Sequence, residues 1–470
     1  MFDFTLEKIA KITQGQLIGP QEAAAIEPRG ASIDTRTLKP GDLFFALQGE
    51  KSDGHAYLEQ AAQAGAVGAV VSYTPEGFTP GRLPLILLPE PLKALQQTAL
   101  SMRRQFGGPV VAVTGSTGKT TTKDMVWSVL SEKGEVLRNI GNYNNELGVP
   151  LTLLSLEKKH WAIVLEMGMR ALGEIDFLAC LAEPDYGIIT NVGHTHQELL
   201  GSQENIARAK AELIAHIPSG GGIILNKEDR ALLKPWLSNA RSGIMWIGRN
   251  APADLWARDI REIWSKAGQP AVSFSVWSGA GKEATVELPV PGIHNVANAL
   301  LAIGIARRLS FTWEEIKAGL QKLQLTAMRL ELKTIPARKI LLINDAYNAN
   351  PASMQAALEV LKSGAASGGR AIAVLGDMYE LGDYEEEGHR LVGQKVQEAG
   401  VSRLITVGRI ARFIAAGAAG AGMNKEYIHI CEDKVQALSI LEEILEPQDV
   451  VLIKGSRGIK MEEIAKGLAL

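Results

Sequence analysis

The chain has 470 residues, of which 46% are hydrophobic and 21% are charged, and its formal net charge is −3. A globular chain of this length is expected to divide into about three domains. The composition is that of an ordinary globular protein, and the small net charge argues against the broad basic surface of a nucleic-acid-binding protein.

Two further features bear on where the chain works. Cys180 and Cys431 lie far apart in the sequence and have no partners at metal-binding spacing. This favours a reducing compartment and argues against a disulfide scaffold or a zinc site. The N-terminal stretch MFDFTLEKIAKITQGQ lacks the apolar core of a signal peptide, and no apolar run is long enough to span a bilayer. We therefore expect a cytoplasmic protein without membrane insertion or nucleic-acid partners.

The first segment, residues 1–106, mixes strand-like and helical patterns. The runs DLFFAL, GAVGAVV and PLILL predict strands, whereas YLEQAAQAGA and LKALQQTALSMRRQF predict helices. The Gly-Gly-Pro sequence at 107–109 ends the last of these helices. We expect an N-terminal α/β domain here.

The second segment, residues 107–326, alternates strands with helices. The runs VVAVTG, WAIVLEMG, YGIITNVG and GGIILN are each followed by a loop, which is typical of a parallel sheet wrapped by helices. Between about 240 and 292, the runs MWIGR, AVSFSVW and ATVELPV predict a small antiparallel annex. Two helices, HNVANALLAIGIARRL and TWEEIKAGLQKL, follow the annex.

The third segment, residues 327–470, alternates again. The runs KILLINDAY, RAIAVLGDM, RLITVG and DVVLIKGS predict strands separated by helices, which is the pattern of a second doubly wound, Rossmann-like sheet. The expected fold class is therefore α/β in three domains, with short linkers between them.

Residues 109–124, PVVAVTGSTGKTTTKD, lead from a strand through a glycine-rich loop into a helix. The usual phosphate-loop spacing, G-x-x-x-x-G-K-[ST], is not met, because Val113 stands where the first glycine belongs. Even so, Gly115, Gly118 and the following helix bring several backbone N–H groups to one point, which predicts an anion site. The alternative is a tight turn that carries an exposed lysine.

As a nucleotide site, this loop would bring Lys119 to the β- and γ-phosphates and a hydroxyl of Thr120 or Thr121 to Mg²⁺. Glu166 ends the apolar run of WAIVLEMG, where nucleotide-binding sheets place a metal-orienting carboxylate; by itself, a solvated acid is an equal interpretation. The sequence TNVGHTH offers two histidines after the next strand, and their spacing does not choose between them.

Three more stretches carry polar residues of possible function. Lys210 lies in the helical pattern ENIARAKAELIAHI, where periodicity alone favours a solvated lysine. Asn295 and Asn298 lie one turn apart in HNVANAL and suit either a base edge or, for Asn295, a helix cap. The loop NDAYNANPASM follows a strand, where ligands bind in such sheets, so that Asp345 together with Arg329 suits a ribose or a phosphate.

Taken together, these pieces resemble one family over nearly the whole chain, the Mur ligases. The family's short phosphate loop, T-G-[ST]-x-G-K-[ST]-[ST], matches TGSTGKTTTK throughout. Further matching pieces are SIDTRTLKPGDLFFALQGEKSDGH, GNYNNELGVP, EMGM, HNVANAL, DAYNANPASM, LGDMYELG and KGSRGIKME. Of these, GDMYELG and YNANPASM are the most discriminating.

The resemblance implies a three-domain, ATP- and Mg²⁺-dependent peptide ligase of peptidoglycan synthesis. The matching pieces are closest to members that join D-alanyl-D-alanine to UDP-N-acetylmuramoyl-tripeptide through an acyl phosphate. The D-N-P-R motif, which is usual in members that add the third residue to a UDP-muramoyl-dipeptide, is absent from the sequence. The resemblance also implies a cytoplasmic enzyme, and we expect a monomer.

The resemblance further implies roles for individual residues. Nucleotide and phosphate contacts fall on Gly115, Ser116, Thr117, Gly118, Lys119, Thr120, Thr121, Asn295, Asn298, Arg329 and Asp345. Metal contacts fall on Thr120, Glu166, His196 and Lys210, and the catalytic group is Lys119, Glu166, His196 and Lys210. The UDP-sugar and acceptor contacts fall on Ser32, Asp34, Arg36, Asn144 and Asn145.

Two of these assignments depend on the family pattern alone. His196 is preferred to His194 because the family's loop reads N-x-x-x-x-H from Asn191, and Lys210 stands where relatives carry a carbamylated lysine. The chain departs from the pattern at His194 and Thr195, where small residues are usual, and at Ala346, where a serine is usual.

The competing interpretations are a Mur ligase that adds the third residue, a folylpolyglutamate-type ligase, and a non-ligase nucleotide-binding switch. The N-terminal GDLFFALQGEKSDGH argues against the folate enzymes, which generally lack this domain. A nucleotide switch would leave YNANPASM and HNVANAL unexplained.

Overall fold

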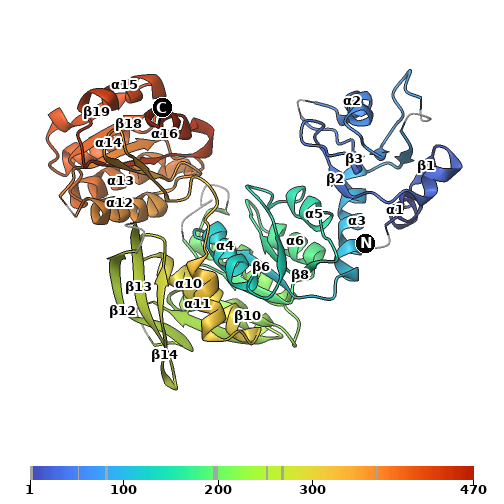
Figure 1. Cartoon of the computed structure of the whole chain (residues 1–470), viewed down its shortest axis with the longest axis horizontal. Helices are drawn as coiled ribbons and strands as arrows, with labels where there is room; N and C mark the ends of the chain where they lie inside the picture. The colour runs from blue at the N-terminus through green and yellow to red at the C-terminus, as the bar shows by residue number, and fades with distance from the viewer. Residues whose placement is uncertain are drawn as a thin grey trace.

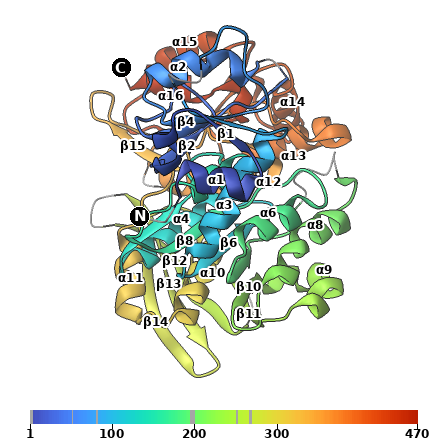
Figure 2. The ribbon, with the colours of Figure 1, turned by 90° about the vertical axis from the view of Figure 1, so that its right-hand side faces the viewer.

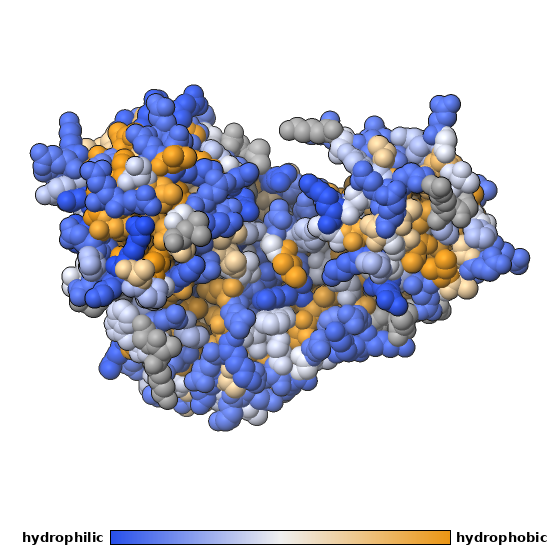
Figure 3. Space-filling view, turned by 45° about the horizontal axis from the view of Figure 1, so that its top comes forward, coloured by the Kyte–Doolittle hydropathy of each residue, from blue (hydrophilic) through white to orange (hydrophobic). Residues whose placement is uncertain are grey.

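A computed structural model describes residues 4–50, 52–79, 83–193, 200–249, 252–265, 269–366 and 368–469. It contains three sheets, and the chain builds them one after another, so that three bodies follow the chain order along the longest axis (Figure 1). The N-terminal and C-terminal bodies both lie above the central one (Figure 2). The surface between them is hollowed and largely hydrophilic (Figure 3). The predicted three-domain α/β fold class is confirmed.

The N-terminal body has a five-stranded sheet in the order β1-β5-β4-β3-β2. Its pairs are parallel except for β1 with β5. The predicted strands are present, although each is shorter than its apolar run. The elements are α1 (Leu6–Thr13), β1 (Gln16–Ile18), β2 (Gly30–Ser32), β3 (Asp42–Phe45), α2 (Leu58–Gln63), β4 (Gly68–Val71) and β5 (Leu85–Leu87).

Helix α3 (Pro91–Gln105) connects the N-terminal body to the central one. Its buried residues Leu95 and Ala99 belong to one apolar cluster that reaches from Phe45 of the N-terminal sheet to Leu165 of the central sheet. The two bodies therefore share a core along this helix. The domain boundary predicted after residue 106 stays a prediction.

The central sheet has nine strands in the order β14-β13-β12-β11-β10-β9-β6-β8-β7. Strand β6 lies between β9 and β8 and runs parallel to both, so the loop that follows β6 leaves the sheet where the strand order reverses. The first elements are β6 (Val110–Thr114), α4 (Lys119–Leu130), β7 (Glu135–Arg138), α5 (Gly148–Leu153), β8 (His160–Glu166), α6 (Glu174–Ala182) and β9 (Tyr186–Ile189). The next are α8 (Gln203–His216), β10 (Gly222–Asn226), α9 (Arg230–Leu233), β11 (Gly243–Gly248), β12 (Leu255–Trp264), β13 (Pro270–Ser278), β14 (Gly281–Leu288), α10 (Asn295–Arg308) and α11 (Trp313–Gln321).

The antiparallel annex is confirmed for the predicted strands β13 and β14, and β12, which was not predicted, also pairs antiparallel with β13, but the predicted start of the annex was wrong. The run MWIGR lies in β11, which pairs in parallel with both β10 and β12. Strand β11 therefore extends the parallel sheet, and the direction of pairing changes only between β12 and β13. Apolar periodicity predicts a strand but carries no information about the direction of its neighbour.

The C-terminal body has six strands in the order β15-β16-β20-β17-β18-β19, and only β15 is antiparallel to its neighbour. The elements are β15 (Glu331–Ile335), β16 (Ile340–Asn344), α12 (Pro351–Ala365), β17 (Ala371–Gly376), α13 (Glu385–Glu398), β18 (Arg403–Val407), α14 (Arg412–Gly420), β19 (Ile428–Cys431), α15 (Lys434–Ile444), β20 (Val450–Lys454) and α16 (Glu462–Leu468). Two apolar clusters fill the two faces of this sheet, and both consist of C-terminal residues alone. The boundary predicted after residue 326 lies between α11 and β15 and stays a prediction.

The helices of this protein are short. The longest, α3 and α12, have 15 residues each. Within the described ranges, no helix is both long enough and apolar enough to cross a lipid bilayer.

Candidate functional site

The glycine-rich loop connects β6 to α4, as the sequence predicts. Gly118 immediately precedes α4 with φ of 76°, in the left-handed region that glycine tolerates best. A Cβ at Gly118 would lie 2.5 Å from Oδ1 of Asn298, and one at Gly115 would lie 1.8 Å from Oγ1 of Thr190. At both positions the side chain of another residue would collide with these neighbours, and at Gly118 the left-handed backbone also favours glycine.

The end of strand β9 holds the loop in shape. The backbone N–H of Thr117 donates to Oδ1 of Asn191 at 3.0 Å, and the Asn191 amide donates back to the Thr117 carbonyl at 3.0 Å. The Thr190 hydroxyl donates to the same carbonyl at 2.6 Å. Ser116 exchanges hydrogen bonds with the backbone of Gly193. Sequence analysis missed Thr190 and used Asn191 only to mark a motif, because a tertiary clamp leaves no local pattern.

Lys119 begins α4 and folds back over its own loop. Its ammonium donates to the carbonyls of Gly115 at 2.8 Å and Ser116 at 3.3 Å. Burial lowers the pKa of Lys119, and Arg329 lowers it further, whereas Glu166 raises it. Phosphate oxygens bound at the loop would compete with these two carbonyls for the ammonium.

Glu166 ends β8 and meets α4 from the neighbouring strand. The Thr120 hydroxyl donates to its Oε2 at 2.7 Å, and the Asn144 amide donates to its Oε1 at 2.9 Å. Burial alone would raise the pKa of Glu166, but Arg329, Lys119 and other cationic neighbours outweigh burial, and the net pKa is lowered. The carboxylate is thus ionised, buried and next to a threonine hydroxyl. These hard oxygen ligands suit Mg²⁺, so Thr120 and Glu166 fit the ion that such loops use.

A second buried carboxylate, on α4, was not predicted. Asp124 accepts hydrogen bonds at 2.8 Å from both the backbone N–H and the hydroxyl of Thr326, in the linker to the C-terminal body. Its other oxygen accepts from Arg138 at 2.7 Å and lies 3.5 Å from the Lys123 ammonium. The helix that begins at the phosphate loop is therefore bonded directly to the interdomain linker.

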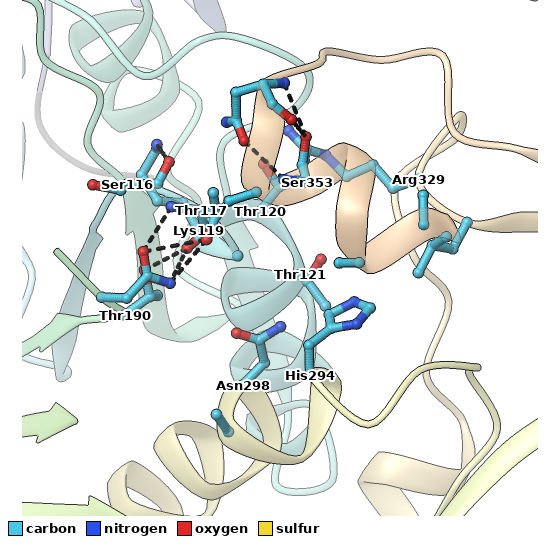
Figure 4. A pocket seen from close by; sticks show the side chains of 18 of the residues that line it. Ser116, Thr117, Lys119, Thr120, Thr121, Thr190, His294, Asn298, Arg329 and Ser353 are labelled. Carbon is cyan, nitrogen blue, oxygen red and sulfur yellow. Dashed lines mark hydrogen bonds between the residues drawn. The ribbon is translucent and has the colours of Figure 1, made fainter. Parts of the chain in front are cut away.

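A cavity of about 460 Å³ opens over the loop, between the central and C-terminal bodies. Figure 4 shows Asn298 entering it from α10 and His294 from the residue before that helix, while Arg329 and Ser353 approach from the C-terminal side. The predicted residues that line it are Ser116, Thr117, Gly118, Lys119, Thr120, Thr121, Asn298, Arg329 and Asp345. Polar lining residues that sequence analysis missed include Asn226, Asp229, Arg249, His294, Tyr347, Asn348, Ser353 and Lys454. The cavity suits a nucleotide that spans both bodies.

The two asparagines of α10 have different positions. Asn298 lines the cavity, and its Oδ1 accepts from the Thr122 hydroxyl of α4 at 3.2 Å. Asn295 is buried outside the cavity lining, where its amide donates to the Pro291 carbonyl at 2.7 Å and its Oδ1 accepts from Asn298. In this arrangement Asn295 supports Asn298 and does not cap α10, while its predicted contact with the nucleotide stays a prediction.

His294 immediately precedes α10 and faces the cavity, which Asn295 does not line. His294 lines the cavity, and burial lowers its pKa to about 4, which leaves the imidazole neutral. A neutral ring at this position offers a flat surface and one hydrogen-bond acceptor to a ligand.

The C-terminal wall carries the predicted pair, Arg329 and Asp345, but each has its own partner. The Arg329 guanidinium lies 4.2 Å from the ring centre of Tyr347, and its Nε is buried without a hydrogen-bond partner among the described residues. Lys454 donates to Oδ2 of Asp345 at 2.5 Å, and the backbone N–H of Leu330 donates to Oδ1 at 3.0 Å. Arg329 therefore has an unused donor at the cavity, whereas Asp345 fixes the wall.

Asp229 follows β10 at the cavity edge. Its Oδ2 is buried without a hydrogen-bond partner in the part of the chain that the structure describes. Burial raises its pKa to about 6, although the backbone N–H of Val192 opposes the shift. This carboxyl is therefore partly protonated near neutral pH.

Lys210 is not the solvated lysine that helical periodicity favours. It lies in α8 with only 1% of its surface exposed. Burial, reinforced by the charge of Lys119, lowers the pKa of Lys210 well below its usual value. A buried amine of lowered pKa is a nucleophile, which is the state that reaction with CO₂ requires.

The predicted substrate-binding residues lie outside the lining of this cavity. In the N-terminal body, the Ser32 hydroxyl bonds the backbone of Asp34, and Arg36 forms a bidentate ion pair with the Asp34 carboxylate. Asn145 accepts hydrogen bonds from the first backbone N–H groups of α5, which gives it a capping role. The predicted metal ligand His196 and its neighbour His194 lie outside the described residues.

Comparisons with known proteins cover the same three bodies. Family models match at residues 28–79 (Mur ligase family, catalytic domain), 113–306 (Mur ligase middle domain) and 328–457 (Mur ligase, glutamate ligase domain). The UDP-N-acetylmuramoyl-tripeptide–D-alanyl-D-alanine ligase of Bacillus subtilis is 39% identical over 470 residues, covering 100% of this chain and 99% of that protein.

Solved structures agree with this match. A crystal structure of MurF from Acinetobacter baumannii has a TM-score of 0.85 and 32% identity, covering 99% of this chain and 98% of that one. MurF ligase from Thermotoga maritima in complex with ADP has a TM-score of 0.79 and 26% identity, covering 94% and 97% of the two chains. By the three family models and by relatives that match along its full length, this chain belongs to the Mur ligase family.

Proposed function

We propose that the chain is an ATP-dependent ligase that joins D-alanyl-D-alanine to UDP-N-acetylmuramoyl-tripeptide, giving the UDP-muramoyl-pentapeptide precursor of peptidoglycan. The observation that carries the proposal is the cavity in which the phosphate loop faces Arg329 of the C-terminal body, with the buried Glu166 hydrogen-bonded to Thr120 of the lining. The match to D-alanyl-D-alanine ligases over the full chain supports the choice of substrates.

The reaction has two steps. A carboxylate oxygen of the tripeptide attacks the γ-phosphorus of ATP, the bond to the β,γ-bridging oxygen breaks, and ADP leaves. The amine of D-alanyl-D-alanine then attacks the carbonyl carbon of the acyl phosphate, loses one proton and expels phosphate. ATP is thus consumed to turn a poor leaving group into a good one.

The first step brings two anions together, and the residues at the loop can offset their repulsion. We propose that Lys119, the first residue of α4, contacts the β- and γ-phosphates of a bound nucleotide and that the N-terminus of α4 attracts the same anions. Arg329 adds a guanidinium with an unused Nε–H from the opposite wall. Because residues of both bodies stabilise the negative charge of the reacting groups, a closed site is favoured. Closure also protects the acyl phosphate from water.

We propose that the Thr120 hydroxyl and the buried, ionised Glu166 carboxylate hold Mg²⁺. We also propose that Lys210 of α8, once carbamylated, and His196 from the segment before α8 contribute to binding the metal. When bound, Mg²⁺ supplies positive charge to the phosphate oxygens. Carbamylation would convert the buried Lys210 amine into an anion that can bind Mg²⁺.

The remaining assignments concern the acceptor. We propose that Ser32, Asp34 and Arg36 receive the UDP-sugar and that Asn144, bonded to Glu166, lies near the acceptor carboxylate. We propose that Asn145, whose side chain accepts a hydrogen bond from the first residue of α5, also lies near the acceptor. We further propose a cytoplasmic enzyme that works as a monomer.

The test is ATP-dependent phosphate release with UDP-muramoyl-tripeptide, with and without D-alanyl-D-alanine, and mass spectrometry of the product. Lysine and diaminopimelate tripeptides are compared in parallel, because the faster one identifies the acceptor. Product formed only when all three substrates are present supports the proposal. Phosphate release that is indifferent to the dipeptide contradicts it, as does product formed from UDP-muramoyl-dipeptide and a single amino acid.

A further inference from the structure

Outside the cavity, one group of three metal-ligating side chains comes together among the described residues. Asp176 and Cys180 lie four residues apart on one face of α6, and His216 is the last residue of α8. One ligand atom from each lies within 4.8 Å of the other two. All three side chains reach the surface, so ions in solution have access to them.

The imidazole of His216 connects the other two side chains. Its Nε2–H donates to Oδ1 of Asp176 at 2.7 Å, which fixes the tautomer and leaves the lone pair of Nδ1 free. That lone pair faces the sulfur of Cys180, with an Nδ1–Sγ distance of 4.0 Å. A carboxylate that binds one ring nitrogen while the other is available as a ligand is the usual environment of a metal-binding histidine.

The nitrogen–sulfur spacing suits a tetrahedral cation. With Zn–S near 2.3 Å and Zn–N near 2.0–2.1 Å, tetrahedral ligation places the two ligand atoms about 3.5 Å apart. The observed 4.0 Å differs from that by only about half an ångström, which a small rotation of the cysteine side chain supplies. A thiolate and an imidazole together favour zinc-like cations over Mg²⁺.

The two helices are rigid where they carry these residues. Ile175 and Leu178 of α6 pack in the same apolar cluster as Leu213 of α8. Glu212, one turn before His216, accepts hydrogen bonds from the backbone N–H groups of Gly173 at 2.8 Å and Asp176 at 3.1 Å. Glu212 thereby fixes the end of α8 against the start of α6, and ligands on such fixed elements keep their spacing.

We propose that Cys180 and His216 bind a zinc-class divalent cation at the surface between α6 and α8, with Asp176 orienting the imidazole. On binding, the sulfur–hydrogen bond breaks and its proton goes to solvent, while bonds form from the metal to Sγ and Nδ1. Water completes the coordination shell. The site is separate from the nucleotide cavity, and it connects the helix that carries Lys210 to the helix that follows Glu166.

The test titrates the intact, reduced protein with Co²⁺ and records the thiolate-to-cobalt charge-transfer absorption, followed by competition with Zn²⁺. We expect one equivalent of thiolate-bound Co²⁺ that Zn²⁺ displaces. C180S and H216Q should abolish the band, whereas D176N should keep it with about 10–100-fold weaker affinity, as for other carboxylates that orient a metal-binding histidine. Oxygen-bound Co²⁺ at Glu166 gives no thiolate band.

The matched control is Glu204→Gln, an exposed acid in the first turn of α8 that lies outside the cluster; it should leave the titration unchanged. Zn²⁺ should also raise the unfolding temperature of the wild type but not of C180S, because a bound ligand stabilises the folded state. No thiolate band in the wild type at saturating Co²⁺, or an unchanged band in C180S or H216Q, would overturn the proposal. Unchanged affinity in D176N would refute the orienting role.

Discussion

The link between Asp124 and Thr326 predicts that one buried carboxylate stabilises the connection between the phosphate-loop helix and the C-terminal body. The change is Asp124→Asn, which keeps the shape but removes the charge. Asp124 is completely buried, and four polar groups surround it: two from Thr326 and one each from Arg138 and Lys123. The substitution leaves those two cations without their carboxylate.

The magnitude follows from these contacts. Removing one partner of a buried ion pair typically costs about 3–5 kcal/mol of unfolding free energy. The Arg138 side chain is 23% exposed and its guanidinium lies 3.8 Å from the ring centre of Trp127, so part of its charge stays solvated and stacked. Burial already lowers the pKa of Lys123, which can lose its proton when Asp124 is neutral. We therefore expect a loss of about 3 kcal/mol, at the low end of that range.

The control pair is Thr326→Val and Thr326→Ser. Valine removes only the hydroxyl bond to the carboxylate and should cost about 1.5–3 kcal/mol at most, whereas serine keeps the bond and should remain near wild type. Because Arg329 lies three residues beyond Thr326, the loosened linker should also lower kcat/KM for ATP.

The measurement is urea unfolding followed by tryptophan fluorescence, with phosphate release measured on the same samples. A protein with three bodies need not unfold in one step, so the comparison concerns the transition of the central body. Asp124→Asn within 0.5 kcal/mol of wild type would refute the reasoning, and so would a greater loss in Thr326→Val than in Asp124→Asn.

Three further predictions concern the cavity. Lys119→Ala should abolish product formation while the circular dichroism spectrum stays native, and Lys159→Ala, at an exposed lysine, is the control. Near-normal turnover in Lys119→Ala would contradict the proposed role of Lys119. Gly118→Ala forces a Cβ into the left-handed region 2.5 Å from Asn298, so it should weaken ADP binding at least about tenfold by calorimetry, and unchanged affinity would contradict the geometry. Since Asp229 has its pKa raised from 3.8 to about 6, the fold has a penalty above pH 6 that disappears as the pH falls toward 4. Asp229→Asn should therefore stabilise the protein at pH 8 by up to about 3 kcal/mol, since the pKa is raised by about 2.2, and by almost nothing at pH 4. An equal stabilisation at pH 8 and pH 4 would show that the buried charge of Asp229 is not the cause.

Local patterns predicted the parts of the site that lie within one stretch of chain. The loop from Gly115 to Lys119 and the carboxylate of Glu166 could be predicted because each follows a strong apolar strand. On the opposite wall Arg329 and Asp345 were predicted, but Lys454 was not, and His294 before α10 was also missed, since nothing near these two residues indicates that they share a cavity. The burial of Lys210 was likewise hidden, because a lysine in a helix gives the same pattern whether the helix faces solvent or the site.

The same limit explains the strands and the metal cluster. Strand β12 carries several charged residues and was not predicted, and the parallel pairing of β11 depends on neighbours that are not adjacent in sequence. Cysteine spacing argued against a zinc site, yet the ligand proposed beside Cys180, His216, comes from another helix. Spacing rules detect sites built within one segment, and this cluster is built between two.

The shared core along α3 has a consequence for how this protein can be taken apart. Cutting the chain after residue 106 would leave apolar surface on both fragments, since Leu95 and Leu165 lie in one cluster. The C-terminal body encloses its own clusters, so a fragment that begins near residue 327 has a complete interior. Modular exchange between relatives should therefore succeed at the second junction and fail at the first, where the two parts must be inherited together.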